Sequence, residues 1–486
     1  MPDITTMIHH LNILRVYIIQ TVRYSIPILI LCFGFSTGCG PDLSSSSRIF
    51  YISPSGNDNN SGTIRRPWKS IDRINHTSFS PGSKVLFEEG ATFNGTIKLD
   101  SLDKGTSDKK IIIGSYGNGN AVIDGGDAEG VFINDCSHFY ISNLIIRGNG
   151  RKEGNVTDGI LISSSSNFVL DSLEVSGFQH SGINVQDCKN ARIINVRAYN
   201  NGFSGIHVTS KNANDPVAYG NENLYIGYCK AYNNPGDPTV LNNHSGNGIL
   251  ASSVRKGIIE YCEAFNNGWD MPWTGNGPVG IWIWDCTDFT IQYCISHNNK
   301  TNPVAADGGG FDLDGGVSNS ILQYCLSYSN QGAGIGLFEF GASKPWENNI
   351  VRYNISLNDG IINEGSLAIW KDERSGTMRN CEIHNNTFLN DTLRGISISF
   401  ITNCQGFTFS KNIFVYRDSF IGKGQKINSE IFTNNIFWSV TGNLIIPPGL
   451  SGGGIVKDPR LKDPGQTRIT DPLKINPNSA LLPSIK

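Results

Sequence analysis

The sequence is poor in charge and, after its N-terminus, in helical patterns. Charged residues make up 17% of the 486 positions, and 39 basic against 42 acidic side chains leave a net charge of −3. A protein that binds nucleic acid by electrostatic attraction needs a clearly basic domain, so that class is excluded. The chain also lacks a glycine-rich phosphate loop before a helix, a Ser–His–Asp signature and zinc-ligand spacing.

Glycine and asparagine are abundant instead. The chain has 55 glycines, which is above the usual share of about 7%. Frequent Gly and Asn with few charges predict many tight turns between short strands. Hydrophobic residues make up 38% of the chain, which argues against disorder.

The N-terminus carries a targeting segment. Arg15 and Arg23 precede an apolar run at 26–35, which is shorter than the about 20 residues of a membrane span. Small residues then lead to Cys39, so residues 1–38 are predicted to be a secretory signal peptide and 39–47 a flexible tether. The Ser-Thr-Gly-Cys sequence resembles a bacterial lipobox, which implies a lipid anchor on Cys39. We expect a secreted, lipid-anchored protein of the bacterial cell envelope that meets the membrane through this lipid only; an ordinary cleaved signal and a retained anchor are the alternatives.

A short phrase, Gly followed by apolar–any–apolar, recurs along the chain. Its first three copies lie 23 positions apart, and later copies are separated by longer insertions; the glycines are Gly159, Gly182, Gly205, Gly248, Gly280, Gly310, Gly334 and Gly395. Between them recur a Tyr-Cys phrase and an Asn pair. Two short strands and a polar turn per repeat predict a coil of parallel strands, with neighbouring coils about 4.8 Å apart.

Equivalent residues of successive coils should stack. We expect the asparagines to share amide hydrogen bonds along the axis. The repeated cysteines are predicted to be small buried hydrophobic residues rather than metal ligands or disulfides: Cys229, Cys262, Cys294 and Cys325.

The segments around the repeats resemble the right-handed parallel β-helix superfold of pectate lyases and related carbohydrate-active proteins. The resemblance rests on Tyr51-Ile-Ser-Pro-Ser-Gly-Asn-Asp58 and Pro67-Trp68, on the repeats, and on Asp458-Pro-Arg-Leu-Lys-Asp463-Pro near the end. It implies an all-β, right-handed parallel β-helix solenoid with N- and C-terminal covers. We assign 48–110 to the N-terminal entry segment and cover, 111–440 to the β-helix with its loops, and 441–486 to the C-terminal cover.

Strand alternation predicts which side chains of the phrase face outward. One outward column reads Leu161, Asn184, His207, Leu250, Trp282, Asp312, Gly336, Ala368 and Ser397, and the other ends Trp284, Asp314, Phe338, Trp370 and Ser399. Exposed aromatic residues can stack on sugar rings. The insertions at 235–246, 268–278 and 300–308 would form the walls of a groove around these aromatic residues. The expected substrate-binding residues are His207, Trp282, Trp284, Phe338, Trp370 and Lys371. Alternatively, the insertions fold over the tryptophans and bury them.

Asp312 and Asp314 form the densest acidic site on a predicted strand. Their Cα atoms would lie about 6.7 Å apart on one face, and two like charges among aromatic residues should raise one pKa. Enzymes that cleave glycosidic bonds commonly use one protonated and one ionised carboxyl group. We therefore predict a glycoside hydrolase that acts on a polysaccharide or oligosaccharide without a cofactor. Glu339, with Lys371 stacked beside it, is a third catalytic candidate.

Two other functions fit the same residues. Asp307-Gly through Gly310-Phe, followed by Gln323-Tyr-Cys-Leu-Ser-Tyr-Ser-Asn330, resembles polysaccharide lyase family nine. That resemblance implies a Ca²⁺-dependent lyase of a uronate-containing glycan, with Asp307, Asp312 and Asp314 as the oxygen ligands that Ca²⁺ prefers. The third possibility is a non-catalytic glycan-binding surface protein.

Overall fold

The computed structural model describes residues 48–342, 344–373, 375–399, 404–422, 431–442 and 455–456. The predicted signal peptide, Cys39, the tether and most of the segment assigned to the C-terminal cover lie outside these residues. Within the described part of the chain, no helix is long and apolar enough to cross a membrane.

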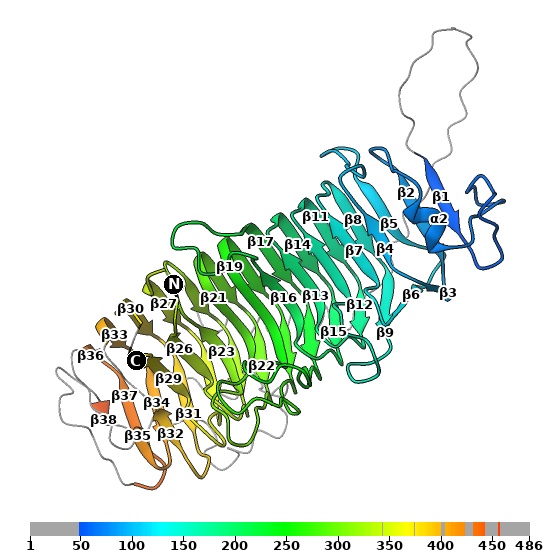
Figure 1. The fold of residues 1–486 in the computed structure, drawn as a ribbon. Coiled ribbons are helices and arrows are strands. Elements are labelled where there is room, and N and C mark those ends of the chain that lie inside the picture. The colour runs from blue at the N-terminus through cyan, green and yellow to red at the C-terminus, as the bar shows by residue number, and fades with distance from the viewer. Residues whose placement is uncertain are drawn as a thin grey trace.

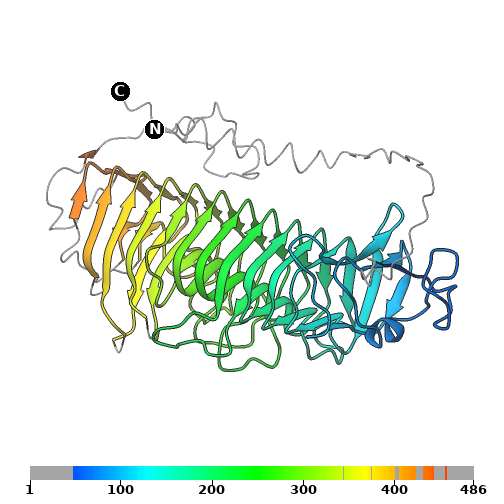
Figure 2. The same cartoon turned by 90° about the horizontal axis from the view of Figure 1, so that it is seen from above.

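The chain winds into a single coil of parallel strands stacked along one axis (Figures 1 and 2). Each turn has three strands, not the two that the repeat predicts; β13 (Ser181–Gln186), β14 (Lys189–Ile194) and β15 (Arg197–Tyr199) make one turn. The third strand is only three residues long here, which hides it in the sequence. The parallel coil itself is confirmed.

The three sides of the coil form two sheets. The first side contains β4 (Ile97–Leu99), β7 (Val131–Asn134), β10 (Ile160–Ser163), β13, β16 (Ser204–Thr209), β19 (Asn247–Glu260), β21 (Val279–Gln292), β23 (Gly309–Leu313), β26 (Ile335–Glu339), β29 (Leu367–Lys371), β32 (Ile396–Ile398) and β35 (Ser419–Ile421). The second side contains β1 (Ile49–Ile52), β2 (Lys84–Glu88), β5 (Ile111–Tyr116), β8 (Phe139–Ser142), β11 (Ser166–Asp171), β14, β17 (Asn221–Gly227), β24 (Ile321–Gln323), β27 (Glu347–Arg352), β30 (Met378–His384), β33 (Cys404–Ser410) and β36 (Ile431–Thr433). Because β19 and β21 run through the corner, bending at the positive φ of Ser253 and Asp285, these two sides join into one 24-stranded sheet.

The third side is a separate 14-stranded sheet. It contains β3 (Thr92–Asn94), β6 (Ala121–Gly126), β9 (Leu144–Gly148), β12 (Glu174–Ser176), β15, β18 (Lys230–Tyr232), β20 (Glu263–Phe265), β22 (Ile295–His297), β25 (Leu326–Tyr328), β28 (Ile355–Leu357), β31 (Thr387–Asn390), β34 (Ile413–Tyr416), β37 (Ile436–Ser439) and β38 (Ile455–Val456).

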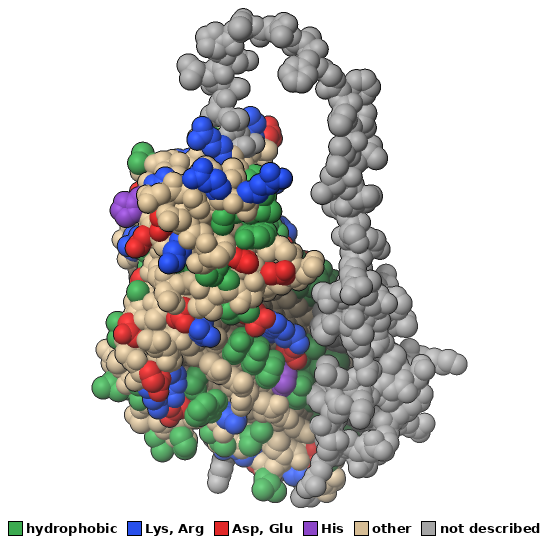
Figure 3. Space-filling model, turned by 90° about the vertical axis from the view of Figure 1, so that its right-hand side faces the viewer, with side chains coloured by type: hydrophobic (Ala, Val, Ile, Leu, Met, Phe, Trp, Pro, Cys, Tyr) green, Lys and Arg blue, Asp and Glu red, His purple; other side chains and the backbone are tan. Residues whose placement is uncertain are grey.

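Helix α2 (Ile71–Asn75) lies at the N-terminal end of the coil. The Ser70 side chain accepts a hydrogen bond from the Arg73 amide and so caps the helix. Ile71 and Ile74 are buried, and the helix packs against β4. Strands β1 and β2 already pair in parallel, so the ladder reaches back into the segment 48–110. Seen from this end, basic, acidic and apolar side chains are interspersed over the described surface (Figure 3).

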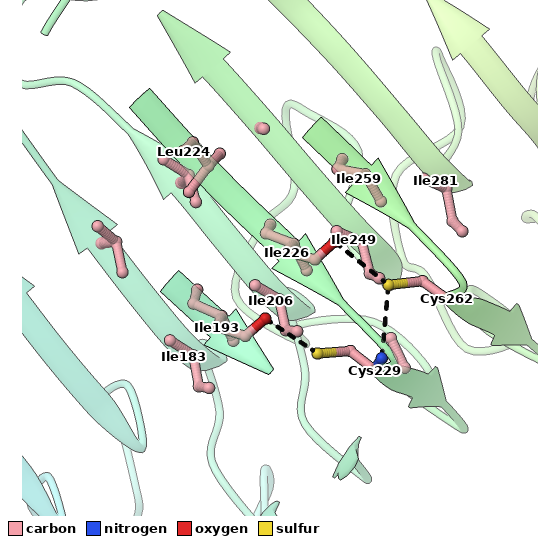
Figure 4. Packing of buried hydrophobic residues seen from close by; sticks show 14 of the residues in the cluster. Ile183, Ile193, Ile206, Leu224, Ile226, Cys229, Ile249, Ile259, Cys262 and Ile281 are labelled. Atoms are coloured by element: carbon pink, nitrogen blue, oxygen red, sulfur yellow. Dashed lines mark hydrogen bonds between the residues drawn. The ribbon is translucent and has the colours of Figure 1, made fainter. Parts of the chain in front are cut away.

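Inward-facing side chains stack into the core. Ile183, Ile206, Ile249 and Ile281 occupy one column and are fully buried (Figure 4). The predicted cysteine column is present as well, and all nine cysteines within the described residues are buried and form no disulfide. Burial raises the pKa of the Cys229 and Cys262 thiols well above the ordinary value. They therefore pack as small hydrophobic residues, as predicted.

A ladder of buried amides runs along the axis beside this core. Each Nδ2 group donates to the Oδ1 atom of the next residue, at 2.8–3.3 Å, through Asn201, Asn234, Asn267, Asn299, Asn330 and finally Asp359. The predicted sharing of amide hydrogen bonds is thus confirmed. An aromatic ladder of stacked tyrosines accompanies it, with ring centroids 5.0–5.2 Å apart: Tyr228, Tyr261, Tyr293, Tyr324 and Tyr353.

The register of the first side confirms the predicted outward columns over most of their length. The first column pairs in the order Leu161, Asn184, His207, Leu250, Trp282, Asp312, Gly336 and Ala368. Its last member was wrong by two residues. Leu367 pairs with Ile398, so Ser399 rather than Ser397 follows Ala368.

Candidate functional site

Asp312 lies on the outer face of β23, between Trp282 on β21 and Gly336 on β26. It is nevertheless only 3% exposed, and its Oδ1 atom has no hydrogen-bond partner. A Cβ on Gly336 would lie 2.7 Å from the Phe338 ring and 3.0 Å from Asp312 Oδ1. The absence of a side chain at Gly336 therefore lets the Phe338 ring fold over the backbone beside this carboxyl group.

Asp312 and its neighbour Asp314 have raised pKa values. Burial, followed by the charge of Asp314, raises the pKa of Asp312 well above its ordinary value. Asp314 follows the end of β23 and is half-buried, and its Oδ1 atom accepts a 2.7 Å hydrogen bond from the Gly315 amide. Burial and the charges of Asp307 and Glu339 raise its pKa to about 7.

Glu339 at the end of β26 is the third acid of the site. It is 2% exposed; its Oε2 atom accepts a 2.9 Å hydrogen bond from the Gly316 amide, and its Oε1 atom has no partner. Burial raises its pKa to about 7, although the charge of Lys371 opposes the shift. Lys371 pairs with Glu339 in register, as predicted, and its Nζ atom donates to the backbone oxygens of Asp372 and Ser375.

Asp307 does not join these acids directly, because it is held at the edge where the strands of the first side begin. Its Oδ2 atom accepts a 2.8 Å hydrogen bond from the Gly277 amide, and its side chain hydrogen-bonds to that of Glu364. A hydrogen bond between two carboxyl groups requires a proton on one of them. Burial raises the pKa of Asp307 to about 6 and that of Glu364 well above the usual range.

Glu364 was missed in the sequence. The available indication was its position two residues before Ser366, which takes the place of the repeat glycine Gly334 on the next turn. The predicted Ca²⁺ ligands Asp307, Asp312 and Asp314 are not brought together as a metal site. Among the described residues, no group of three or more His, Cys, Asp or Glu side chains is placed to hold a metal ion.

Trp282 is not the exposed sugar platform that the sequence predicts. It is 5% exposed and packs with Leu250 and Val279 in a small apolar cluster outside the coil. Its Nε1 atom donates a 3.1 Å hydrogen bond to Asn247, and the His244 ring packs edge-on against it at 5.0 Å. His244 belongs to the insertion 235–246, so the alternative in which insertions bury a tryptophan is correct for Trp282.

Other aromatic residues remain accessible around Asp314. Trp284 is half-buried, and a Cβ on Gly315 would lie 2.9 Å from its Nε1 atom, which places the indole beside the residue after Asp314. Trp370 is 37% exposed, and its ring stacks with that of Phe340, which is 50% exposed, at 6.2 Å. Phe340 was also missed, because it lies just past the end of the strand pattern.

His207 is half-buried on the outer face of β16, away from the acids. Its ring lies 5.1 Å from that of Phe203. Burial, followed by the charge of His244, lowers its pKa to about 3. The imidazole is therefore neutral at ordinary pH, and the register places Leu250 and Trp282 between it and Asp312.

Asp285 lies at the corner where β21 bends and also forms contacts to neighbouring loops. Its φ of 54° fits the turn. Its carboxylate also forms an ion pair with Lys344 at 2.8 Å, with the two side chains 0% and 3% exposed. Lys344 in addition donates to the backbone oxygen of Asp215 and lies 4.4 Å from the Tyr219 ring, which ties the loops beyond β16 and β26 together.

The insertions 235–246, 268–278 and 300–308 form a continuous band along the edge where the strands of the first side begin. Asn243 and Asn276 link the first two loops, at 3.1 Å, and Asn302 donates to the Met271 backbone oxygen in the next link. Asn363 then donates to the Asp307 backbone oxygen at 3.0 Å. Each loop is thus fixed to the loop of the neighbouring turn.

Comparison with known proteins agrees with this architecture. The chain matches a family described as "Pel9A-like, right handed beta helix region" over residues 50–386, which confirms the predicted handedness. A GH136 lacto-N-biosidase from Eubacterium ramulus has a similar fold, with a TM-score of 0.57 at 17% identity over 81% of this chain and 68% of that one. The A-module of the mannuronan C-5 epimerase AlgE4 of Azotobacter vinelandii gives a TM-score of 0.51 at 14% identity, over 79% and 94%. The uncharacterized protein YwoF of Bacillus subtilis is 35% identical over 80 residues, only 16% of either chain.

Proposed function

Because the chain belongs to the Pel9A-like right-handed β-helix family, we propose that it is a carbohydrate-active enzyme that hydrolyses glycosidic bonds. The observation that carries the proposal is the group of carboxyl groups on the first side of the coil. Asp312 has a pKa well above its ordinary value, while the pKa values of Asp314 and Glu339 rise to about 7. Strongly raised pKa values are costly to a fold and are typical of catalytic acids and bases.

The proposed roles follow from the surroundings of the two carboxyl groups. Burial favours the protonated form of Asp312 and raises its pKa, so Asp312 is the proposed acid that donates a proton to the glycosidic oxygen. Asp314 loses its proton near pH 7 and acts as the base or nucleophile, with Glu339 as the substitute candidate. The Phe338 ring lies beside Asp312, so we expect this ring to turn aside when a sugar binds.

The aromatic residues around Asp314 supply the proposed contacts to sugar rings. Trp284 and Phe338 flank it on the neighbouring turns, and Trp370 with Phe340 extends the surface by one more turn. Lys371 at the same strand end can hydrogen-bond to a hydroxyl or carboxylate of the glycan. The proposed substrate is a polysaccharide or oligosaccharide. Residues 1–47 lead us to propose, in addition, export and a lipid anchor on Cys39.

The fold of two similar structures supports a carbohydrate substrate. One is a lacto-N-biosidase and the other a mannuronan epimerase, and both resemble this chain at a TM-score above 0.5. Their activities belong to those proteins, so the reaction proposed for this chain rests on its own carboxyl groups.

The test is a panel of plant, algal and animal glycans, assayed both for new reducing ends and for the ultraviolet absorbance of an unsaturated uronide. Hydrolysis gives reducing ends without that absorbance, and Asp312→Asn abolishes their release. Asp288→Asn is the matched control, because Asp288 is exposed on β21 and its φ of 54° suits Asn. A chelator-sensitive rise in absorbance would establish the lyase instead. Glycan retention in affinity gels without any product would establish a binding protein.

A further inference from the structure

The outer face of the third side changes from charged to apolar halfway along the coil. Over the N-terminal turns, one outward column consists of charged residues: Glu174, Arg197, Lys230 and Glu263. The register continues this column from Glu263 to Ile295, and the later turns carry aliphatic and aromatic side chains instead. These side chains form an apolar face outside the coil, separate from its core: Ile295, Leu326, Leu357, Leu389, Ile413 and Val415, with Tyr328, Ile355, Ile436 and Trp438 packed against them.

The apolar face is buried although it points away from the core. Its six central side chains are only 2–6% exposed. Stacking between turns does not explain this burial, because Tyr199, Tyr232 and Phe265 stack closely in the same outward columns and stay partly exposed. None of the helices and strands that the structure describes lies across the face, since the strands belong to the coil and α2 lies at its N-terminal end. The face therefore needs a cover from elsewhere.

The chain that follows β38 starts beside this face. β38 pairs with β37 at the end of the third side, and residues 457–486 come after it. The apolar face extends from β22 to β37, which is about 24 Å along the axis at about 4.8 Å per turn. About eight extended residues, at about 3.3 Å each, span this distance. Residues 457–486 are therefore long enough to run back over the whole face.

The composition of residues 457–486 suits an apolar sheet face. Leu473 and Ile475 alternate with polar residues, as in a strand with one buried side. Three more aliphatic residues follow near the end, Leu481, Leu482 and Ile485. The five prolines of the segment exclude a long continuous helix and favour short extended pieces.

We propose that residues 457–486 dock on the apolar face of the third side and run back over it toward β22. The sequence predicts only a cover for residues 441–486, and the apolar face gives the last part of that cover a place along the side of the coil. Removal of these side chains from water drives the docking, because the hydrophobic effect grows with the apolar area buried. The segment then holds successive turns of the coil together. This inference does not depend on the proposed hydrolysis, because the acids lie on the first side.

Photochemical cross-linking of the full chain tests the docking. The photoreactive amino acid p-benzoylphenylalanine takes the place of Ile355, which is half-buried within the apolar face. Irradiation should join this position to residues 457–486 of the same chain, as identified by mass spectrometry of the peptides. The matched control has the photoreactive amino acid at Arg197, which is exposed in the same outward column, and should give no cross-link to this segment.

Other cross-links would overturn the inference. Attachment to residues 1–47 or to a second copy of the chain would assign the face to another occupant, and no attachment to protein would leave it uncovered. The wild-type protein supplies a second measurement if the labelled variant does not fold. Trypsin should cut after Arg468 and Lys474 at least about 10-fold more slowly in the folded protein than in a synthetic peptide of residues 457–486. Equal cleavage rates would also overturn the docking.

Discussion

Replacing Glu339 by Gln should stabilise the protein at pH 8 more than at pH 5. Glu339 is 2% exposed, and burial raises its pKa from 4.5 to about 7. Between these two values the unfolded chain releases the proton while the folded protein keeps it. The free energy of unfolding therefore falls as pH rises from 4.5 to 7 and stays low above 7.

The magnitude follows from this shift. Each pKa unit corresponds to about 1.4 kcal/mol, so the ionised carboxylate costs roughly 3 kcal/mol at pH 8 and below about 1 kcal/mol at pH 5. Gln cannot ionise, and its Oε1 atom can still accept the hydrogen bond of the Gly316 amide. The stability difference between variant and wild type should thus be about 2 kcal/mol more favourable at pH 8 than at pH 5.

Urea unfolding followed by tryptophan fluorescence at both pH values measures this difference. Any constant cost of burying the new amide cancels when the two pH values are compared. Glu382→Gln is the control, because Glu382 is exposed on β30, and its effect should be small at both pH values. A Glu339→Gln variant that loses stability relative to wild type on going from pH 5 to pH 8 would refute the reasoning.

Three further predictions concern the aromatic surface, the amide ladder and the thiols. Trp370→Ala removes an exposed stacking face worth about 0.5–1.5 kcal/mol and should raise KM roughly 2- to 10-fold with little change in kcat; an unchanged KM would remove Trp370 from the binding surface. Asn267→Ala removes one acceptor of the Asn234 side-chain amide and the side-chain donor to the Ala231 backbone oxygen, and should cost about 2–4 kcal/mol in unfolding experiments; a cost near zero would show that water replaces the ladder. The nine cysteines of the described part should react with a thiol reagent only after denaturation, because they are buried and the pKa of Cys188, for example, is raised to about 12; labelling of the folded protein would contradict the packing.

The architecture could be predicted because it follows from the short-range periodicity of glycine and apolar residues in the sequence. The Gly-apolar-any-apolar phrase fixes which residues point inward, and register then fixes the columns, as the neighbours Trp282, Asp312 and Gly336 confirm. The three-residue third strands could not be seen, because a segment of that length shows no alternation. The offset at Ser399 has a similar cause, since the variable loop before β32 hides the start of the strand.

The environment of the site was less predictable, because loops decide it. Alternation placed Trp282 correctly on the outer face, but only the path of the insertion 235–246 reveals that His244 covers it. Asp312 was placed equally well, yet alternation shows neither that it is buried nor that the Phe338 ring lies near it. Glu364 reaches Asp307 across turns whose insertions differ in length, and this pairing follows no repeat.

The pH dependence of kcat/KM for glycan hydrolysis tests the central claim most directly. Wild-type protein should show a limb with an apparent pKa of about 7, the value to which burial and neighbouring charges raise Asp314. Asp314→Asn should lose that limb and fall about 10²- to 10⁴-fold in rate while remaining folded. An Asp314→Asn protein that keeps both the wild-type rate and the limb would contradict the assignment of this carboxyl group to catalysis.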